Sequence, residues 1–254
     1  MPKSSIRAVA VVELGDCRPS AHSHPAHRFA GRNLKGQSLI SRMVRRISDS
    51  LLVKEIVISG EQVPATILTA GILGAQVIDY PNTHVIERLA AAADRTDCDW
   101  VVFLPGNRPF VDPVLVDRLL SEAGRATDCD YVGYFSPRGG WQRMQQLGLA
   151  AEICHADALR RLRRNLDRLS SSVENMSLSA WFQDAPGVYQ MRFIPVPKEL
   201  DRNDLRFAVE NEQDWDNAQL LCDSIAGDET QWQPLAEIAL AHSDRQMPME
   251  RQIS

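Results

Sequence analysis

The chain has 254 residues, 44% of them hydrophobic, and a formal net charge of −5. This length suits one large α/β domain or two small ones, and the acidic balance does not indicate a general nucleic-acid-binding surface. No apolar run approaches the roughly 18–20 residues that a membrane span needs, and no small-residue cleavage site suggests a signal peptide. Five scattered cysteines without a CxxC pair favour reduced thiols, so we expect a cytoplasmic protein.

Strand-length apolar runs alternate with helix-length amphipathic stretches along most of the chain. The predicted strands cover residues 8–14, 54–60, 75–80, 99–106 and 130–135. The predicted helices cover residues 38–50, 84–95 and 112–124. In the third helix, Asp112 is a good N-cap and Pro113 suits the first helical position. Strands that are apolar on both faces and alternate with helices predict a mainly parallel sheet with helices on both faces, an α/β fold.

Composition divides the chain near residue 227, where it becomes more polar. We therefore expect one domain over residues 1–226, followed by a peripheral helix and a loose C-terminal tail over residues 227–254.

The stretch RFAGRNLKGQSLI (28–40) lies between the first predicted strand and the first predicted helix. Gly31 and Gly36 allow close backbone approach. The cations of this stretch are Arg28, Arg32 and Lys35. A basic loop that contains glycine and precedes a helix N-terminus predicts an anion site for phosphates. The stretch is neither a GxGxxG motif nor a Walker loop, so a solvated basic loop is the open alternative.

Ligands of open α/β sheets bind at the carboxyl ends of the strands, which directs attention to VVFLPGNRPFVDP (101–113). There a buried strand ends in Pro-Gly, and Asn107 and Arg108 follow before the next helix. In this stretch the sequence resembles the sugar cytidylyltransferases, namely the KDO and acylneuraminate cytidylyltransferases and the spore-coat polysaccharide SpsF-like proteins. Their motifs have counterparts here in the same order: RFAGRNL, HVIERL, GNRPFVDP, GLAAEICHADALRRL and VENEQDWDNAQLL.

The resemblance implies a single-domain glycosyltransferase-A or nucleotidyltransferase-like fold over residues 1–226. It implies transfer of CMP from CTP to an acidic or modified sugar for surface polysaccharide synthesis, with Mg²⁺ as cofactor and a possible homodimer. The implied nucleotide-binding residues are Arg28, Gly31, Arg32 and Gly106. The implied catalytic residues are Arg32, Asn107 and Glu210, with Asn107 and Glu210 also facing the metal. Arg108 and Glu152 are expected on the sugar side.

Departures from the family pattern gather at the chemical centre. A family lysine is Arg32 here, and two metal-binding aspartates correspond to Asn107 and Glu210. The arginine of a further motif is absent from Val173–Met176. Magnesium prefers charged oxygen ligands, so the neutral amide predicts a weak or altered metal site. The alternative is therefore a catalytically degenerate relative that binds a nucleotide or sugar and acts as a partner protein in polysaccharide assembly.

Three further patterns have plainer interpretations. The histidines His22, His24 and His27 form no recognisable ligand spacing with a carboxylate or cysteine, so a surface loop is favoured over a metal site. The two DCD sequences precede their strands, at the edge away from the expected site. The basic stretch LRRLRRNLDRL (159–169) is typical of an amphipathic helix with its leucines inward, and contact with an anionic partner is the second interpretation.

Overall fold

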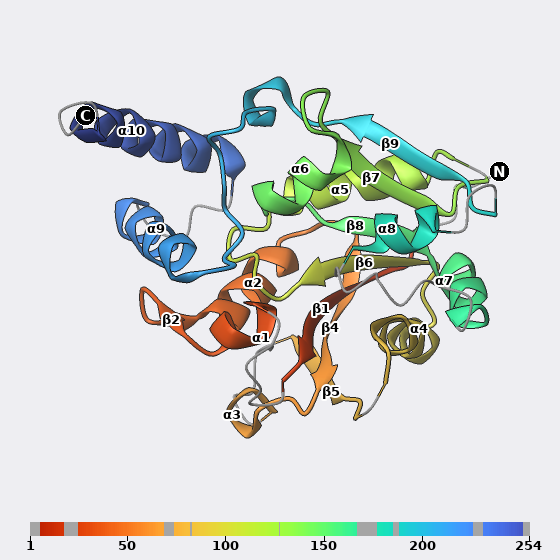
Figure 1. Ribbon diagram of the computed structural model, residues 1–254. Helices are drawn as coiled ribbons and strands as arrows, with labels where there is room; N and C mark the ends of the chain where they lie inside the picture. Colours follow the sequence, from red (N-terminus) through yellow and green to blue (C-terminus); the bar gives the residue numbers. More distant parts are fainter. Residues whose placement is uncertain are drawn as a thin grey trace.

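The computed structural model describes residues 6–17, 25–68, 74–81, 83–126, 128–166, 177–184, 188–225 and 231–250. Within these residues the chain forms a seven-stranded sheet in the order β5-β4-β1-β6-β8-β7-β9 (Figure 1). Its strands are β1 (Ala8–Asp16), β4 (Val53–Glu61), β5 (Ala75–Asp79), β6 (Trp100–Pro105), β7 (Tyr131–Phe135), β8 (Glu152–His155) and β9 (Met191–Pro195). The predicted α/β fold is confirmed.

Only β8 runs against its neighbours among these strands. It pairs antiparallel with both β6 and β7, whereas β1 pairs parallel with β4 and β6, β4 with β5, and β7 with β9. Because β8 is antiparallel to both of its neighbours, β7 runs in the same direction as β6, and so does β9. The carboxyl ends of β1, β4, β6, β7 and β9 therefore lie along one edge of the sheet, where ligands of such folds bind.

Alternate residues of β1 point into two separate hydrophobic cores. Ala10 and Val12 belong to the core that contains α2 (Leu39–Ser48), α5 (Pro113–Ala123) and α6 (Gly140–Leu147). Val9 and Val11 belong to the core under the opposite helices. Those helices are α4 (Val85–Thr96), α7 (Ala156–Arg163) and α8 (Leu178–Gln183). The period of two in a strand thus explains why β1 is apolar throughout.

Local sequence signals set the helix starts. Asp112 accepts a hydrogen bond from Leu115 N at 2.9 Å, and Pro113 follows as the first helical residue, as predicted. Ser38 Oγ likewise accepts from Ser41 N at 3.1 Å at the start of α2.

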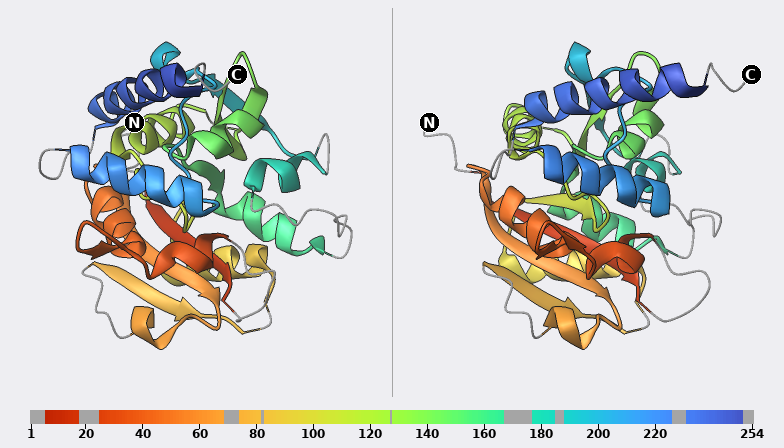
Figure 2. Two further views of the ribbon diagram at one scale, coloured as in Figure 1. Left: turned by 60° about the vertical axis from the view of Figure 1, so that its left-hand side comes forward. Right: turned by 90° about the vertical axis from the view of Figure 1, so that its left-hand side faces the viewer.

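The remaining elements are short, except for two helices near the C-terminus of the described chain. They are α1 (Pro25–Ala30), β2 (Asn33–Leu34), β3 (Gln37–Ser38), α3 (Ala65–Leu68), the 3₁₀ turn η2 (Lys198–Leu200), α9 (Glu212–Ser224) and α10 (Trp232–Glu250). Helix α9 lies between the N-terminal elements α1 and β2 on one side and α10 on the other (Figures 1 and 2). Leu235 and Ala236 anchor the first turns of α10 in the core. In the described part of the chain, no helix has the length and apolarity of a membrane span.

A buried ion pair joins the carboxyl end of β1 to α4. Arg88 Nη2 lies 2.6 Å from Glu13 Oε1, and both side chains are almost fully buried. Glu13 also accepts from Gly15 N at 2.8 Å, and Arg88 donates to Thr83 O. Burial nevertheless raises the pKa of Glu13, because desolvation outweighs the attraction of Arg88. The pair therefore depends on both partners being present.

We expect Arg88→Met to lower the free energy of unfolding by about 3–5 kcal/mol, because it leaves the Glu13 carboxylate buried without its counter-ion. The double variant Glu13→Gln with Arg88→Met should lose clearly less free energy of unfolding than Arg88→Met alone, since no buried charge remains unpaired. Urea unfolding of the wild type and the variants measures the difference. A double variant less stable than Arg88→Met would contradict this account.

Candidate functional site

The turn after β6 is packed tightly against β1. Gly106 N donates to Glu13 O at 2.8 Å. A Cβ on Gly106 would lie 2.7 Å from Leu14 Cδ2 and 3.2 Å from Glu13 O. A larger residue would crowd β1 at this position, and the hydrogen bond from Gly106 holds the following residue, Asn107, at the carboxyl edge of the sheet.

Asn107 and Glu210, which are 103 positions apart, lie on neighbouring segments. Val209 N donates to Asn107 O at 2.9 Å, so Glu210 follows directly on a segment hydrogen-bonded to the turn. Asn107 is 5% exposed, and Glu210 lies nearer the surface. The structure thus brings together the two residues that the resemblance placed at the metal.

The Glu210 carboxylate already has a cation. Arg206 Nη2 lies 2.6 Å from Glu210 Oε2, and Arg206 Nε lies 2.7 Å from Asp214 Oδ1. The hydrogen bonds that Arg206 donates to the two carboxylates, above all the one to Asp214, raise the pKa of Arg206. Asp214 in turn accepts from Glu210 N at 2.9 Å, which ties the segment to the start of α9.

These side chains do not by themselves suit Mg²⁺. Asn107 offers a neutral amide, and the charge of Glu210 is balanced by Arg206, whereas Mg²⁺ prefers charged oxygen ligands. Within the described ranges, no three histidine, cysteine, aspartate or glutamate side chains gather closely enough to hold a metal ion.

Arg108 points into the protein and is 3% exposed. It donates to Ala150 O and to Gln145 Oε1. Burial lowers the pKa of Arg108, and the charges of Glu152 and Glu210 oppose that shift. Arg108 and these two carboxylates therefore influence one another through their charges, although no ion pair joins them.

Glu152, at the start of β8, is equally enclosed. Its carboxylate accepts hydrogen bonds from the Tyr131 hydroxyl at 2.8 Å and from the backbone of Leu178 at 3.1 Å and Ser179 at 2.9 Å. Ser177 Oγ adds a further one at 3.3 Å. In this arrangement Glu152 holds α8 to the sheet, and a sugar would have to displace these donors to reach it.

Arg28 and Arg32 converge on one carboxylate. Arg28 Nη2 lies 2.6 Å from Glu212 Oε1, and Arg32 Nη1 lies 2.6 Å from Glu212 Oε2. The hydrogen bond from Arg32 lowers the pKa of Glu212. Beside them, a Cβ on Gly31 would meet no described atom within 4 Å, so no protein contact requires this glycine. No role was predicted for Glu212, although it lies within the motif VENEQDWDNAQLL.

The same loop is stacked on α9. The rings of Phe29 and Trp215 lie 5.7 Å apart with an interplanar angle of 13°. The guanidinium of Arg32 lies 4.2 Å from the Trp215 ring centroid. This cation–π contact fixes the direction in which Arg32 presents its charge.

Lys35 has a different role from the one expected. Its Nζ donates to Cys222 O at 3.1 Å and to Ile225 O at 3.0 Å, at the C-terminus of α9. A cation at this end of a helix is favourable because the last carbonyls lack helical partners. Lys35 therefore holds α9 in place, and the cations that converge at the loop are Arg28 and Arg32.

Other predicted features have structural roles or lie outside the described residues. Asp97 and Asp99 bind Arg7, and Asp130 binds Arg161, in agreement with a location away from the site. The basic stretch is paired as well, since Asp94 binds both Arg160 and Arg163. Among the predicted features, four lie outside the described parts of the chain. They are His22, His24, the His27 side chain and Val173–Met176.

With this geometry in place, the chain can be compared with known proteins. Residues 30–181, more than half of the chain, match the MobA-like NTP transferase domain. The chain belongs to this family. The MobA-like region contains the first loop from Ala30, the turn at Asn107 and the strand that carries Glu152. Glu210, Glu212 and Trp215 lie beyond it.

Two curated relatives agree with the resemblance found in the sequence. The chain is 20% identical over 198 residues to the spore coat polysaccharide biosynthesis protein SpsF of Bacillus subtilis (strain 168), covering 75% of this chain and 78% of SpsF. It is 27% identical over 99 residues to the 3-deoxy-manno-octulosonate cytidylyltransferase of Geotalea daltonii, covering 37% of this chain and 39% of that protein. The resemblance to sugar cytidylyltransferases is confirmed.

Solved structures share the fold of this MobA-like protein. A cytidylyltransferase from Leptospira borgpetersenii matches with a TM-score of 0.72 and 15% identity, covering 94% of this chain and 95% of that one. A CMP:2-keto-3-deoxy-manno-octonic acid synthetase complexed with CTP matches with a TM-score of 0.57 and 14% identity, covering 87% of this chain and 99% of that one. At these identities the likeness concerns the fold alone.

The convergence of two guanidiniums on Glu212 generates a prediction. Glu212→Gln should tighten the binding of inorganic tripolyphosphate severalfold, because the anion no longer competes with the chain's own carboxylate. Arg32→Ala should weaken it tenfold or more, since a charge-assisted contact contributes roughly 1.5–3 kcal/mol. Titration calorimetry measures both affinities.

Asp216→Asn is the matched control for Glu212→Gln. Asp216 is exposed on the same helix and has no hydrogen bond or ion pair to a described residue, so this change removes one negative charge without freeing an arginine. Equal tightening by both variants would attribute the effect to net charge and would remove Glu212 from the anion site.

Proposed function

We propose that this protein is a cytidylyltransferase that transfers CMP from CTP to an acidic or modified sugar for surface polysaccharide synthesis. The observation that carries the proposal is the convergence of Arg28 and Arg32 on the carboxylate of Glu212. Gly31 lies between the two arginines in the chain, and Glu212 begins the helix that follows Glu210. Membership of the MobA-like NTP transferase family supports it. The names of the relatives, SpsF and 3-deoxy-manno-octulosonate cytidylyltransferase, support the sugar and the cytidine nucleotide.

In this reaction a sugar oxygen attacks the α-phosphorus of CTP, a new P–O bond forms, and pyrophosphate leaves. Negative charge builds on the phosphate oxygens and on the leaving group. Arg28 and Arg32 would bind the phosphates and neutralise that charge, after the nucleotide displaces Glu212. The open space at Gly31 would admit a phosphate close to the backbone, and Gly106 would keep the Asn107 turn against β1. Because CTP is the donor, we place the reaction in the cytoplasm.

Asn107 and Glu210 would face the reacting phosphates. Magnesium, when bound to the nucleotide, would supply positive charge at the phosphate oxygens. Since Asn107 is neutral and Glu210 is paired with Arg206, the chain's own contribution to holding the ion would be small, and the proposal assigns the ion mainly to the triphosphate. Arg108 and Glu152 are assigned to the sugar side of the centre, where they support the surrounding strands.

The second candidate is a catalytically degenerate relative that binds a nucleotide or sugar and acts as a partner protein in polysaccharide assembly. The observation that favours it is the ion pair between Arg206 and Glu210, which occupies the carboxylate expected at the metal. Pairing into a homodimer is proposed for either candidate.

The test of the proposed function is pyrophosphate release. Purified protein with Mg²⁺ is given each nucleoside triphosphate against a panel of acidic, amino and neutral sugars. We expect release with CTP and at least one sugar, and loss of most of that release in Arg32→Ala. Binding of CTP without release in any combination would support the degenerate candidate, and absence of both would contradict the proposal.

The neutral side chain at position 107 gives a second prediction. Asn107→Asp adds a carboxylate of nearly the same shape, so it should make CTP binding depend on Mg²⁺ by tenfold or more. The wild type should show a clearly smaller difference between Mg²⁺ and EDTA. Calorimetry with CTP under both conditions measures this. If both proteins respond to Mg²⁺ alike, Asn107 does not face the metal, and the ion is held elsewhere.

A further inference from the structure

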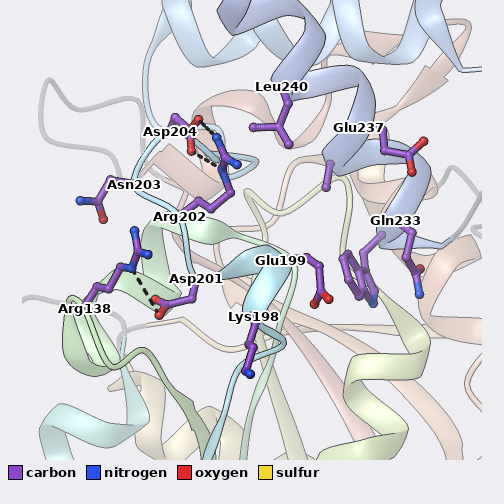
Figure 3. A pocket seen from close by; sticks show the side chains of 12 residues that line it. Arg138, Lys198, Glu199, Asp201, Arg202, Asn203, Asp204, Gln233, Glu237 and Leu240 are labelled. Atoms are coloured by element: carbon purple, nitrogen blue, oxygen red, sulfur yellow. Dashed lines mark hydrogen bonds and ion pairs between the residues drawn. The ribbon is translucent and has the colours of Figure 1, made fainter.

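A cavity of about 920 Å³ lies at the carboxyl edge of the sheet, beyond the ends of β7 and β9 (Figure 3). Arg138 lines it from the turn after β7, and residues 198, 199 and 201–204 line it from the segment after β9. The first turns of α10 close the remaining side. Apart from Arg138, every lining residue lies beyond residue 181, outside the part that matches the family. The cavity is therefore a feature in which this chain can differ from other members.

One face of α10 forms an apolar wall of the cavity. Trp232, Ala236 and Leu240 are spaced four residues apart and so lie above one another on the helix. Gln233 and Glu237 form a polar row next to them. An indole beside carboxylate and amide groups suits a sugar, because a sugar ring has an apolar C–H face and an edge of hydroxyl groups.

The charges of the lining are only partly balanced. Arg202 Nη2 lies 2.7 Å from Asp204 Oδ2, and Arg138 Nε lies 3.8 Å from Asp201 Oδ2. The other charged side chains are Lys198, Glu199 and Glu237, and none of them is hydrogen-bonded or ion-paired with a described residue. Two carboxylates against one ammonium leave a negative excess. The lining therefore favours a neutral or cationic ligand over an acidic one.

The cavity is connected to the candidate active site by a fixed segment. Arg143 donates to Arg202 O and Leu205 O, and Val209 N donates to Asn107 O at 2.9 Å. By contrast, the space between Arg108 and Glu152 is nearly filled by the protein's own side chains. Of these two spaces, the one beside Trp232 is large enough to hold a second substrate.

We propose that this cavity is the sugar subsite and that it selects neutral or amino sugars over acidic ones. The proposal rests on the proposed function, and it narrows the acceptor class from acidic or modified sugars to uncharged or amino-substituted ones. Trp232 stacks on the ring, and Glu199 and Glu237 accept hydrogen bonds from hydroxyl or ammonium groups.

The test compares three probes of one ring configuration: glucosamine, glucose and glucuronate. Saturation-transfer NMR should detect binding of glucosamine and glucose to the wild type, with glucuronate at least fivefold weaker. Trp232→Ala should weaken the binding of glucosamine tenfold or more. Glu237→Gln should reduce the preference for glucosamine over glucuronate, whereas Glu55→Gln, near the start of β4 and not among the residues that line the cavity, should leave it unchanged. Circular dichroism and thermal unfolding of Trp232→Ala establish that it is folded, and if it is not, Glu237→Gln carries the test.

Preference for glucuronate, unchanged binding in both cavity variants, or no binding of any probe would overturn the proposal. CTP titrations of the same proteins separate it from the proposed function. If CTP binds and depends on Arg32 while no probe binds, the sugar subsite is wrong and the nucleotide site stands. If the probes bind through Trp232 while CTP does not bind, the proposed function is wrong and the cavity remains a sugar site.

Discussion

The rest of the site depends on the polar contacts that the loop at residues 28–40 makes with both ends of α9. Lys35 binds carbonyl groups at the C-terminus of α9, while Arg28 and Arg32 bind Glu212 at its N-terminus. Stacking of Phe29 on Trp215 joins the two segments between these points. Since Glu210 lies only two residues before Glu212, the first residue of α9, these contacts also set where the Glu210 carboxylate lies relative to Asn107. Two segments about 180 residues apart therefore form one unit.

Within this unit the protein's own carboxylates occupy the positions next to its arginines. Glu212 binds Arg28 and Arg32, and Glu210 binds Arg206. In the proposed function, a phosphate would therefore have to replace an internal carboxylate to reach these arginines. These pairs are partly exposed, and exposed pairs contribute little to stability, which makes them replaceable. The buried pair of Glu13 and Arg88 has the opposite character, because it holds β1 to α4 and no ligand can compete for it.

The family-matched region and the segments after it provide different parts of the structure. Residues 30–181 provide most of the sheet, the Asn107 turn and the enclosed Glu152. The segments that follow add η2, the stretch up to Val209, α9 and α10, and these cover the carboxyl edge from two sides (Figures 1 and 2). In the proposed function, both the phosphate side and the acceptor side would therefore depend on segments that lie outside the family-matched region.

The sequence alone determined five of the seven strands of the main sheet, several of the helices and the family, because continuous apolar runs, the helix cap at Asp112 and ordered motifs are local signals. It also placed Asn107 and Glu210 at one edge. The antiparallel direction of β8, the burial of Arg108 and Glu152 and the capture of Arg28 and Arg32 by Glu212 were decided by tertiary structure. So were the use of Lys35 as a helix cap and the cavity beside Trp232. Strand direction and charge pairing depend on which distant segments meet, and neither spacing nor residue type records that.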